Sequence, residues 1–317
     1  MSGIKTASGY ANEHGLFIPA HASGKILYDF FCEGDLPKLA RTDFDITDGK
    51  SLACYEKAYF SHSGEVCETD YDEGHNGQAT RLDMNMRTDF AEACQELKFD
   101  MKFSRSLAAR MCENWNTYGQ AAEVQVNRWM TERTEGFGLV KIAASAAPYN
   151  VGNSAGKITQ SIELGTFANP LSISILGSTV IAQRMLEVAM ESSLTCAIND
   201  LILYISPKMY SGFLTDQSKL GTCCPEDNPF VTGMVKTSLG FNLLGFRNGR
   251  TPYAGVNGAG QKVWYIMLIN PMDVWFPFDL HYFEWDKRGH DMYLIGYGTY
   301  GLKVFRGDSV VVAAVTI

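Results

Sequence analysis

Alternating apolar and polar residues predict two strands in the first third of the chain. Apolar side chains occupy every second position from Leu82 to Met86 and again from Leu97 to Phe103, with charged or amide side chains between them. This period of two is typical of a half-buried strand. Residues 63–78, upstream of the first alternation, are rich in turn formers and acidic residues. The pattern predicts a long two-stranded ribbon with an acidic tip.

A different period marks two helices. From Ser104 to Gly136, apolar residues recur at steps of three and four, which is the spacing of one helix face. Ser104 is a favourable N-cap, and Gly136 followed by Gly138 is expected to end the helix. Such a helix would be about 45–50 Å long. A second helical pattern covers residues 178–198.

Short apolar runs bounded by glycine or proline predict the remaining strands. The run Leu201–Ile205 ends at Ser206-Pro207, and the apolar spacing after Pro207 predicts a helix that begins there. Further runs of this kind occupy residues 231–235, 243–246, 263–269, 292–297, 302–305 and 310–317. The mixture of helices and separate strands indicates an α+β protein.

The order of these elements resembles the major capsid proteins of tailed bacteriophages, which have the Hong Kong 97-type capsid fold. The resemblance covers nearly all 317 residues and is most specific at Ile205-Ser206-Pro207 and at Gly240-Phe241. It implies an N-terminal arm, an extended E-loop, a peripheral domain with a long spine helix, and an axial domain. The implied boundaries are 1–48 for the arm, 49–103 for the E-loop ribbon, 104–198 for the peripheral domain with its spine helix over 104–136, 199–270 for the axial domain, and 271–317 for strands that return to the peripheral domain.

The resemblance also implies a function. The chain is expected to be a structural protein, not an enzyme, that assembles with itself into pentamers and hexamers of an icosahedral shell. The shell would enclose double-stranded DNA in the virion after assembly in the host cytoplasm. Partners expected from the family are a separate scaffolding protein, a portal and a decoration protein. An encapsulin-type bacterial compartment with the same fold is an alternative.

Most of the negative charge of the chain lies in the predicted ribbon. The formal net charge is −8, and the chain contains no Lys/Arg cluster of the kind that follows a phosphate backbone. Between Glu56 and Asp100, eleven acidic residues outnumber four basic ones, so this segment carries nearly all of the excess. A two-stranded ribbon is marginally stable alone, so it is expected to contact a neighbouring subunit. The predicted interface residues are Glu65, Cys67, Glu68, Asp70, Asp72, Glu73, Arg81 and Arg87.

The motifs that suggest catalysis or metal binding are less specific than this resemblance. Gly152-Asn153-Ser154-Ala155-Gly156 matches the G-x-S-x-G elbow, which makes a cytoplasmic serine hydrolase using Ser154 the alternative from another class. Acidic residues at 43–48 and 68–73 suggest calcium, but a solvated acidic face explains them better. No CxxC or HExxH spacing occurs, so neither a metal nor another cofactor is predicted. No apolar run is long enough to cross a membrane.

Overall fold

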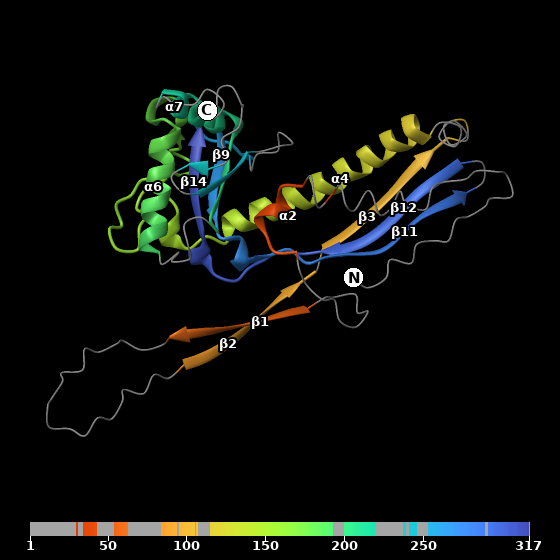
Figure 1. Cartoon of the computed structure of the whole chain (residues 1–317), viewed down its shortest axis with the longest axis horizontal. Coiled ribbons are helices and arrows are strands. Elements are labelled where there is room, and N and C mark those ends of the chain that lie inside the picture. Colours follow the sequence, from red (N-terminus) through yellow and green to blue (C-terminus); the bar gives the residue numbers. More distant parts are fainter. Residues whose placement is uncertain are drawn as a thin grey trace, which may run out of the picture.

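A computed structural model describes residues 30, 34–42, 54–62, 84–93, 95–104, 106, 115–192, 200–219, 237–238, 241–245, 253–288 and 291–316. The described chain contains a body built on a seven-stranded sheet, a long helix that leads away from it along a three-stranded sheet, and a separate hairpin (Figure 1). This is the α+β organisation that the sequence predicted.

The seven-stranded sheet forms because its central strands are apolar on both faces. Its order is β4-β14-β9-β5-β7-β6, and β8 also pairs with β9. Alternate residues of β14 enter two different cores: Val310 and Val312 join one, whereas Val311 and Val315 join the other. The strands are β4 (Leu171–Ser172), β5 (Ile202–Ile205), β6 (Thr237–Ser238), β7 (Phe241–Gly245), β8 (Tyr253–Val256), β9 (Lys262–Ile269) and β14 (Val310–Thr316).

Helices α6 (Ser178–Glu191) and α7 (Pro207–Lys219) contribute to the core on one face of this sheet. Strand β5 and helix α7 occur where the sequence predicted them, and Pro207 is the first residue of α7. The short helices are α5 (Ile173–Leu176) and the 3-10 turns η1 (Pro148–Asn150), η4 (Pro271–Asp273) and η5 (Gly307–Ser309).

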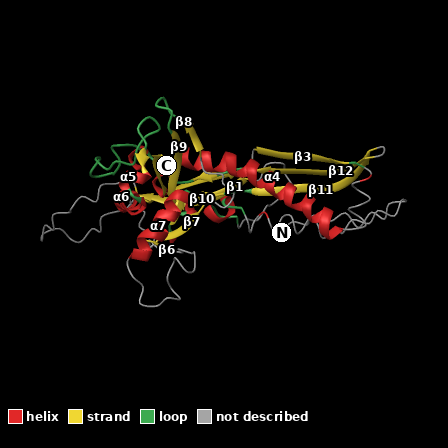
Figure 2. Ribbon diagram, turned by 90° about the horizontal axis from the view of Figure 1, so that it is seen from above, coloured by secondary structure: helices red, strands yellow, loops and turns green. Residues whose placement is uncertain are grey.

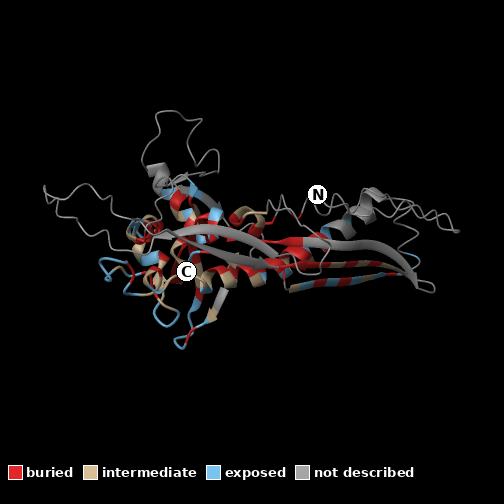
Figure 3. Cartoon of the chain, turned by 90° about the horizontal axis from the view of Figure 1, so that it is seen from below, coloured by how far each residue is buried: buried red, intermediate tan, exposed pale blue. Residues whose placement is uncertain are grey.

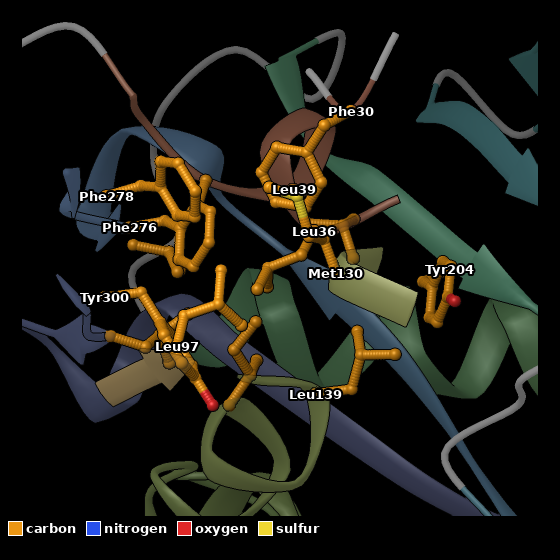
Figure 4. Packing of buried hydrophobic residues seen from close by; sticks show 14 of the residues in the cluster. Phe30, Leu36, Leu39, Leu97, Met130, Leu139, Tyr204, Phe276, Phe278 and Tyr300 are labelled. Carbon is orange, nitrogen blue, oxygen red and sulfur yellow. The ribbon is translucent and has the colours of Figure 1, made fainter. Parts of the chain in front are cut away.

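The second core lies between α4 (Trp115–Ala144), the three-stranded sheet and the other face of the large sheet. In the three-stranded sheet, β12 (Asp291–Tyr300) pairs antiparallel with both β11 (Phe278–Arg288) and β3 (Gln95–Phe103). The predicted alternation in β3 is confirmed, because Leu97, Phe99 and Phe103 are buried between exposed polar residues. Figure 4 shows Leu97, Met130 and Tyr300 within this core.

The ribbon prediction is partly confirmed. Strands β1 (Cys54–His62) and β2 (Met84–Glu92) pair antiparallel, from Cys54 opposite Glu92 to His62 opposite Met84, and form a sheet of their own. The hairpin projects from the rest of the described chain (Figure 1). Strand β3, which the prediction places in the ribbon of residues 49–103, follows the hairpin directly and pairs with β12 instead.

Residues 34–42, which the prediction places in the arm of residues 1–48, pack within the body. Helix α2 (Leu36–Leu39) places Leu36 and Leu39 in the core beside α4, and Phe30 is buried with them (Figure 4). Arg41 continues the contact through a backbone bridge to Trp275 in β10 (Val274–Trp275), which pairs with β13 (Lys303–Val304). Apolar burial within one chain therefore holds this part of the predicted arm; residues 1–29 lie outside the described part.

Two other elements pack with partners from across the predicted domain boundaries. Helix α6, assigned with residues 104–198 to the peripheral domain, packs with α7 on the large sheet. Strand β14, assigned to the returning strands, pairs with β9 and β4 in that same sheet, whereas β11 and β12 do pair with β3 beside α4. The prediction grouped elements by their order in the sequence. The packing instead joins strands and helices that are far apart in the sequence.

Helix α4 does not end at Gly136 as predicted, because it continues to Ala144. Glycine weakens a helix without necessarily stopping it. Gly138 has a packing role: a Cβ there would lie 2.5 Å from Leu36 Cδ2, so its missing side chain lets α2 lie close to α4. The predicted first turns at residues 107–114 lie outside the described part of the chain.

The two glycines of α4 are expected to respond in opposite directions to alanine. Gly138→Ala forces the buried Leu36 side chain to move and is expected to lower the free energy of unfolding by about 1–3 kcal/mol. Gly136→Ala meets no atom within 4 Å, so better helix propensity is expected to raise stability by about 0.5–1 kcal/mol. Urea denaturation of both variants checks the pair, and equal shifts would contradict the packing role of Gly138.

Candidate functional site

Seven of the eight predicted interface residues lie between β1 and β2 in the sequence. Glu65, Cys67, Glu68, Asp70, Asp72, Glu73 and Arg81 all lie outside the described residues, as do the two acidic clusters that were weighed as calcium ligands. Arg87 lies in β2, where its backbone is opposite Tyr59 of β1. The structure thus describes the hairpin that carries these residues and leaves their role as a prediction.

An exposed stripe runs along the C-terminal half of α4. Positions 133, 136, 140 and 144 are exposed, and Phe137 and Lys141 are partly buried between them. Their spacing of three and four residues places them on one face of the helix. The face combines two cations, Arg133 and Lys141, with Val140, which is 58% exposed. Neither cation forms an ion pair within the described part of the chain, whereas Arg128 bonds Glu132 at 2.9 Å beside the stripe.

Two more cations lie beyond the end of α4, around Tyr149. Lys157 Nζ lies 5.8 Å from the centre of the Tyr149 ring, and the charge of Arg306 acts on the Tyr149 hydroxyl. That hydroxyl donates a hydrogen bond to Asp308, and burial together with this bond raises the pKa of Tyr149 to about 12. Asp308 is therefore already engaged, while Lys157 and Arg306 are exposed.

Asn150 fixes this region to the large sheet. Its side chain is fully buried, and its Nδ2 donates to the carbonyl oxygens of Asp308 at 3.1 Å and Val310 at 3.0 Å. These bonds join the turn after α4 to the start of β14. The hydrogen bonds of Asn150 therefore fix the backbone just after Arg306.

Glu191 holds a loop that presents an apolar side chain. Its Oε2 accepts hydrogen bonds from the backbone N–H groups of Ile158 at 2.9 Å and Thr159 at 3.1 Å. The base of the loop is closed by paired backbone bonds between Ala155 and Ile162. Ile158 is 78% exposed at the top of this loop. Figure 3 shows exposed residues concentrated on loops around the large sheet.

Glu191→Ala is expected to release this loop without unfolding the body. The two backbone hydrogen bonds lower the pKa of Glu191 below its ordinary value of 4.5. Their contribution is present above that value and is lost as pH falls through the lowered pKa of the folded state. Amide exchange at residues 157–160, corrected for intrinsic rates, should accelerate in the variant at neutral pH and in the native protein under strong acid. Unchanged exchange in the variant would contradict this role.

The predicted nucleophile elbow is absent at Ser154. An elbow needs a strand before the serine and a helix after it. Here η1 and a single bridge residue, Val151, precede Gly152, and a second bridge residue, Ala155, follows Ser154. Ser154 therefore lies in an exposed turn and does not have the geometry of that nucleophile.

The sequence did not predict a buried polar cluster that the structure contains. Glu135 Oε1 accepts the backbone N–H of Asp35 at 2.7 Å, and the Tyr204 hydroxyl donates to Asp35 Oδ2 at 3.1 Å. All three residues are buried. Burial, together with the two carboxylates, raises the pKa of Tyr204, so its hydroxyl remains a donor. The cluster connects α2, α4 and β5, and its partners are too far apart in sequence for any motif to reveal them.

Within the described ranges, no group of three or more His, Cys, Asp or Glu side chains is arranged to hold a metal ion. No helix in the same ranges is long and apolar enough to cross a membrane.

No protein-family model and no curated protein matches this chain. Solved structures do match it. A protein of Mycobacterium phage Che8 matches with a TM-score of 0.54 and 14% identity, over 88% of this chain and 90% of that chain. The capsid structure of the cyanophage P-SCSP1u gives a TM-score of 0.51 and 12% identity, over 86% and 84% of the two chains.

The procapsid of satellite phage P4, which includes its size determination (Sid) protein, is similar to the same extent. Its TM-score is 0.51 with 7% identity, over 92% of this chain and 89% of that chain. At identities this low, the TM-scores and the shared length establish a common fold and nothing beyond it. The chain therefore has the α+β, Hong Kong 97-type fold of tailed-phage capsid proteins.

Proposed function

We propose that this protein is the major capsid protein of a tailed phage, which assembles with itself into an icosahedral shell around DNA. The observation that carries the proposal is the extent of the fold similarity, which covers 86% of this chain for the cyanophage capsid and 92% for the P4 procapsid. A similarity over so much of the chain extends well beyond the large sheet. It supports a shared architecture rather than one shared module.

In this proposal, each part of the fold has a structural role. The hairpin β1–β2 is the E-loop, α4 is the spine helix, and the seven-stranded sheet with α6 and α7 is the axial domain. Residues 1–29 are the arm that reaches a neighbour. The large sheet and the three-stranded sheet share one core with α4 and α2, so the subunit is a stiff unit.

The hairpin supports assembly for an energetic reason. It is a separate two-stranded sheet within the described chain. Such a sheet is marginally stable in water unless another surface covers it. A neighbouring subunit in a closed shell supplies that surface, and each subunit in turn covers the hairpin of the next.

The proposed partners follow from the same role. The subunits form pentamers and hexamers, assisted by a separate scaffolding protein, a portal and a decoration protein. Double-stranded DNA is enclosed without sequence-specific contacts, which is compatible with a net charge of −8. The site of action is the virion.

Electron microscopy tests the proposal directly. The full chain is expressed in bacteria alone and together with the neighbouring structural genes of its genome, and the products are separated by sedimentation. Closed shells of uniform size are expected in at least one of the two preparations. A chain that remains monomeric in both would contradict the proposal. Shells that package a specific cargo protein when assembled in their native cell, in place of DNA, would favour the encapsulin-type compartment.

A further inference from the structure

We propose that strand β3 pairs edge to edge with the same strand of a second copy of this chain, antiparallel and about a two-fold axis at Phe99. The inference rests on the proposed function and deepens it, since it assigns a symmetric contact between two subunits of the shell. Three observations carry it: the position of β3 in its sheet, the order of charges along the strand, and a hollow beside its midpoint.

Strand β3 is an edge strand within the described part of the chain. The order of its sheet is β11-β12-β3, so β12 flanks it on one side and no described strand flanks it on the other. Figure 2 shows β3 at the outer margin of this sheet. The strand is nine residues long and contains no proline, so its whole length suits pairing with another extended chain.

The charges along β3 are complementary to themselves. Its exposed positions alternate in sign, in the order Glu96, Lys98, Asp100 and Lys102. An antiparallel pair centred at Phe99 places Lys98 of one copy opposite Asp100 of the second copy. It likewise places Glu96 opposite Lys102, and symmetry makes each match occur twice. Opposite charges directly across a strand pair are stabilising, whereas like charges are destabilising.

The same charges select one register. If the centre moves by one residue, to Lys98 or Asp100, the central residue lies opposite its own copy and like charges meet. If it moves by two residues, one of the two charge matches is lost. Centring at Phe99 also aligns the apolar face, because Leu97 then lies opposite Met101 of the second copy and Phe99 opposite itself. Charge and apolar pattern therefore agree on the same axis.

A mostly apolar hollow of about 350 Å³ lies at this midpoint, between β3 and α4. It is lined by Lys98, Phe99, Asp100, Met101, Val126 and Trp129. The rings of Phe99 and Trp129 meet edge to face at 5.6 Å, and Gly296 on β12 leaves room for the Phe99 ring. In the proposed pair, Phe99 of the second copy lies across the edge at this point, where its ring can fill the hollow.

A simpler explanation accounts for only part of this arrangement. Charged side chains, lysine above all, are common on edge strands because they discourage pairing. Two of them also bond within the chain: Lys98 to Glu96 at 2.5 Å and Lys102 to Asp291 at 2.6 Å. Both lysines are about 60% exposed, and exposed ion pairs are weak, so these bonds leave room for a partner. Discouraging pairing requires charge in any order, and it explains neither the complementary order nor the hollow at its centre.

Disulfide trapping between two variants tests the register. One tagged chain carries Lys98→Cys and an untagged chain carries Asp100→Cys. Residues directly opposite in an antiparallel pair have Cα atoms about 4.5–5.5 Å apart, which a disulfide can span. After mild oxidation of the co-assembled chains, a tagged–untagged dimer is expected at about five times the level that the unaltered chain's own cysteines produce.

The matched control pairs Lys98→Cys with Lys102→Cys. These positions are diagonal neighbours in the proposed register, about 7–8 Å apart, which is too far for an unstrained disulfide. This combination is expected to remain at the background level. Equal trapping of the two combinations would overturn the proposed register.

Charge reversal tests the energetics. Lys98→Glu alone and Asp100→Lys alone each place like charges opposite each other twice, and each is expected to lower shell yield about tenfold. Both substitutions in one chain restore the matches and are expected to recover most of the yield. Co-expression of the two single variants is expected to recover part of it, because unlike copies again match. Both positions are exposed, and unchanged melting confirms that each variant folds.

Two further results would overturn the contact: normal yield from both single variants, or recovery in the double variant without any recovery on co-expression. The second result would place the effect of these charges within one subunit. Shells that form without trapping above the control would refute this contact and leave the proposed function intact. A chain that forms no oligomer at all would refute both, so the two failures are distinguishable.

Discussion

Replacement of residues 64–77 by a short Gly-Ser turn is expected to leave a folded subunit that closes no full-size shells. The described cores are built from α2, α4, α6, α7 and the two larger sheets, and the hairpin forms a sheet of its own. Loss of the tip therefore removes contacts to a neighbour while the body keeps its packing. Circular dichroism should report native helix content, and electron microscopy should find only small oligomers.

A length-matched variant distinguishes the two properties of the tip. Changing its five carboxylates to amides keeps the reach of the hairpin and removes its charge. Partial shell yield from this variant, with none from the shortened one, would mean that reach and charge both contribute. Normal shells from the shortened variant would contradict the assignment of this hairpin as the E-loop.

Gly165→Ala is expected to destabilise the subunit more than alanine at another positive-φ glycine, Gly177. Gly165 is buried with φ +77°, and a Cβ there would lie 2.5 Å from the carbonyl oxygen of Ala314 in β14. The strained backbone and the clash with a central strand together are expected to cost about 3–5 kcal/mol. Main-chain atoms of a central strand cannot move aside as a side chain can.

Gly177→Ala is the matched control. Gly177 has φ +83°, but a Cβ at this residue would have no atom within 4 Å. Only the backbone strain remains, at about 1–2 kcal/mol. Urea denaturation of the two variants measures the difference. Equal loss of stability would mean that contact with β14 is not what restricts residue 165.

The sequence predicted those elements whose signal is local. Alternation identified β3 because one face of that strand is buried and the other is not. Pro207 marked the start of α7 because its fixed φ suits a first helical position. In both cases the physical cause lies within a few residues of the element itself.

Features set by distant partners were missed. Gly138 looked like a helix stop because the approach of Leu36, about a hundred residues earlier, leaves no trace in its neighbourhood. The bonds from Asp35 to Glu135 and from Tyr204 to Asp35 join residues 100 and 169 positions apart. The stripe on α4 was missed because exposed cations resemble any solvated helix face until the structure shows which carboxylates surround them.

The position of β14 has a consequence for synthesis on the ribosome. Its two neighbours, β4 and β9, are translated well before residues 310–316, and β14 pairs with them on its two opposite edges. Until that segment emerges, β9 has an unpaired apolar edge, which is the kind of surface that chaperones and proteases recognise. A product truncated before residue 310 would lack this strand, so we expect it to be degraded or to aggregate rather than to compete with intact subunits.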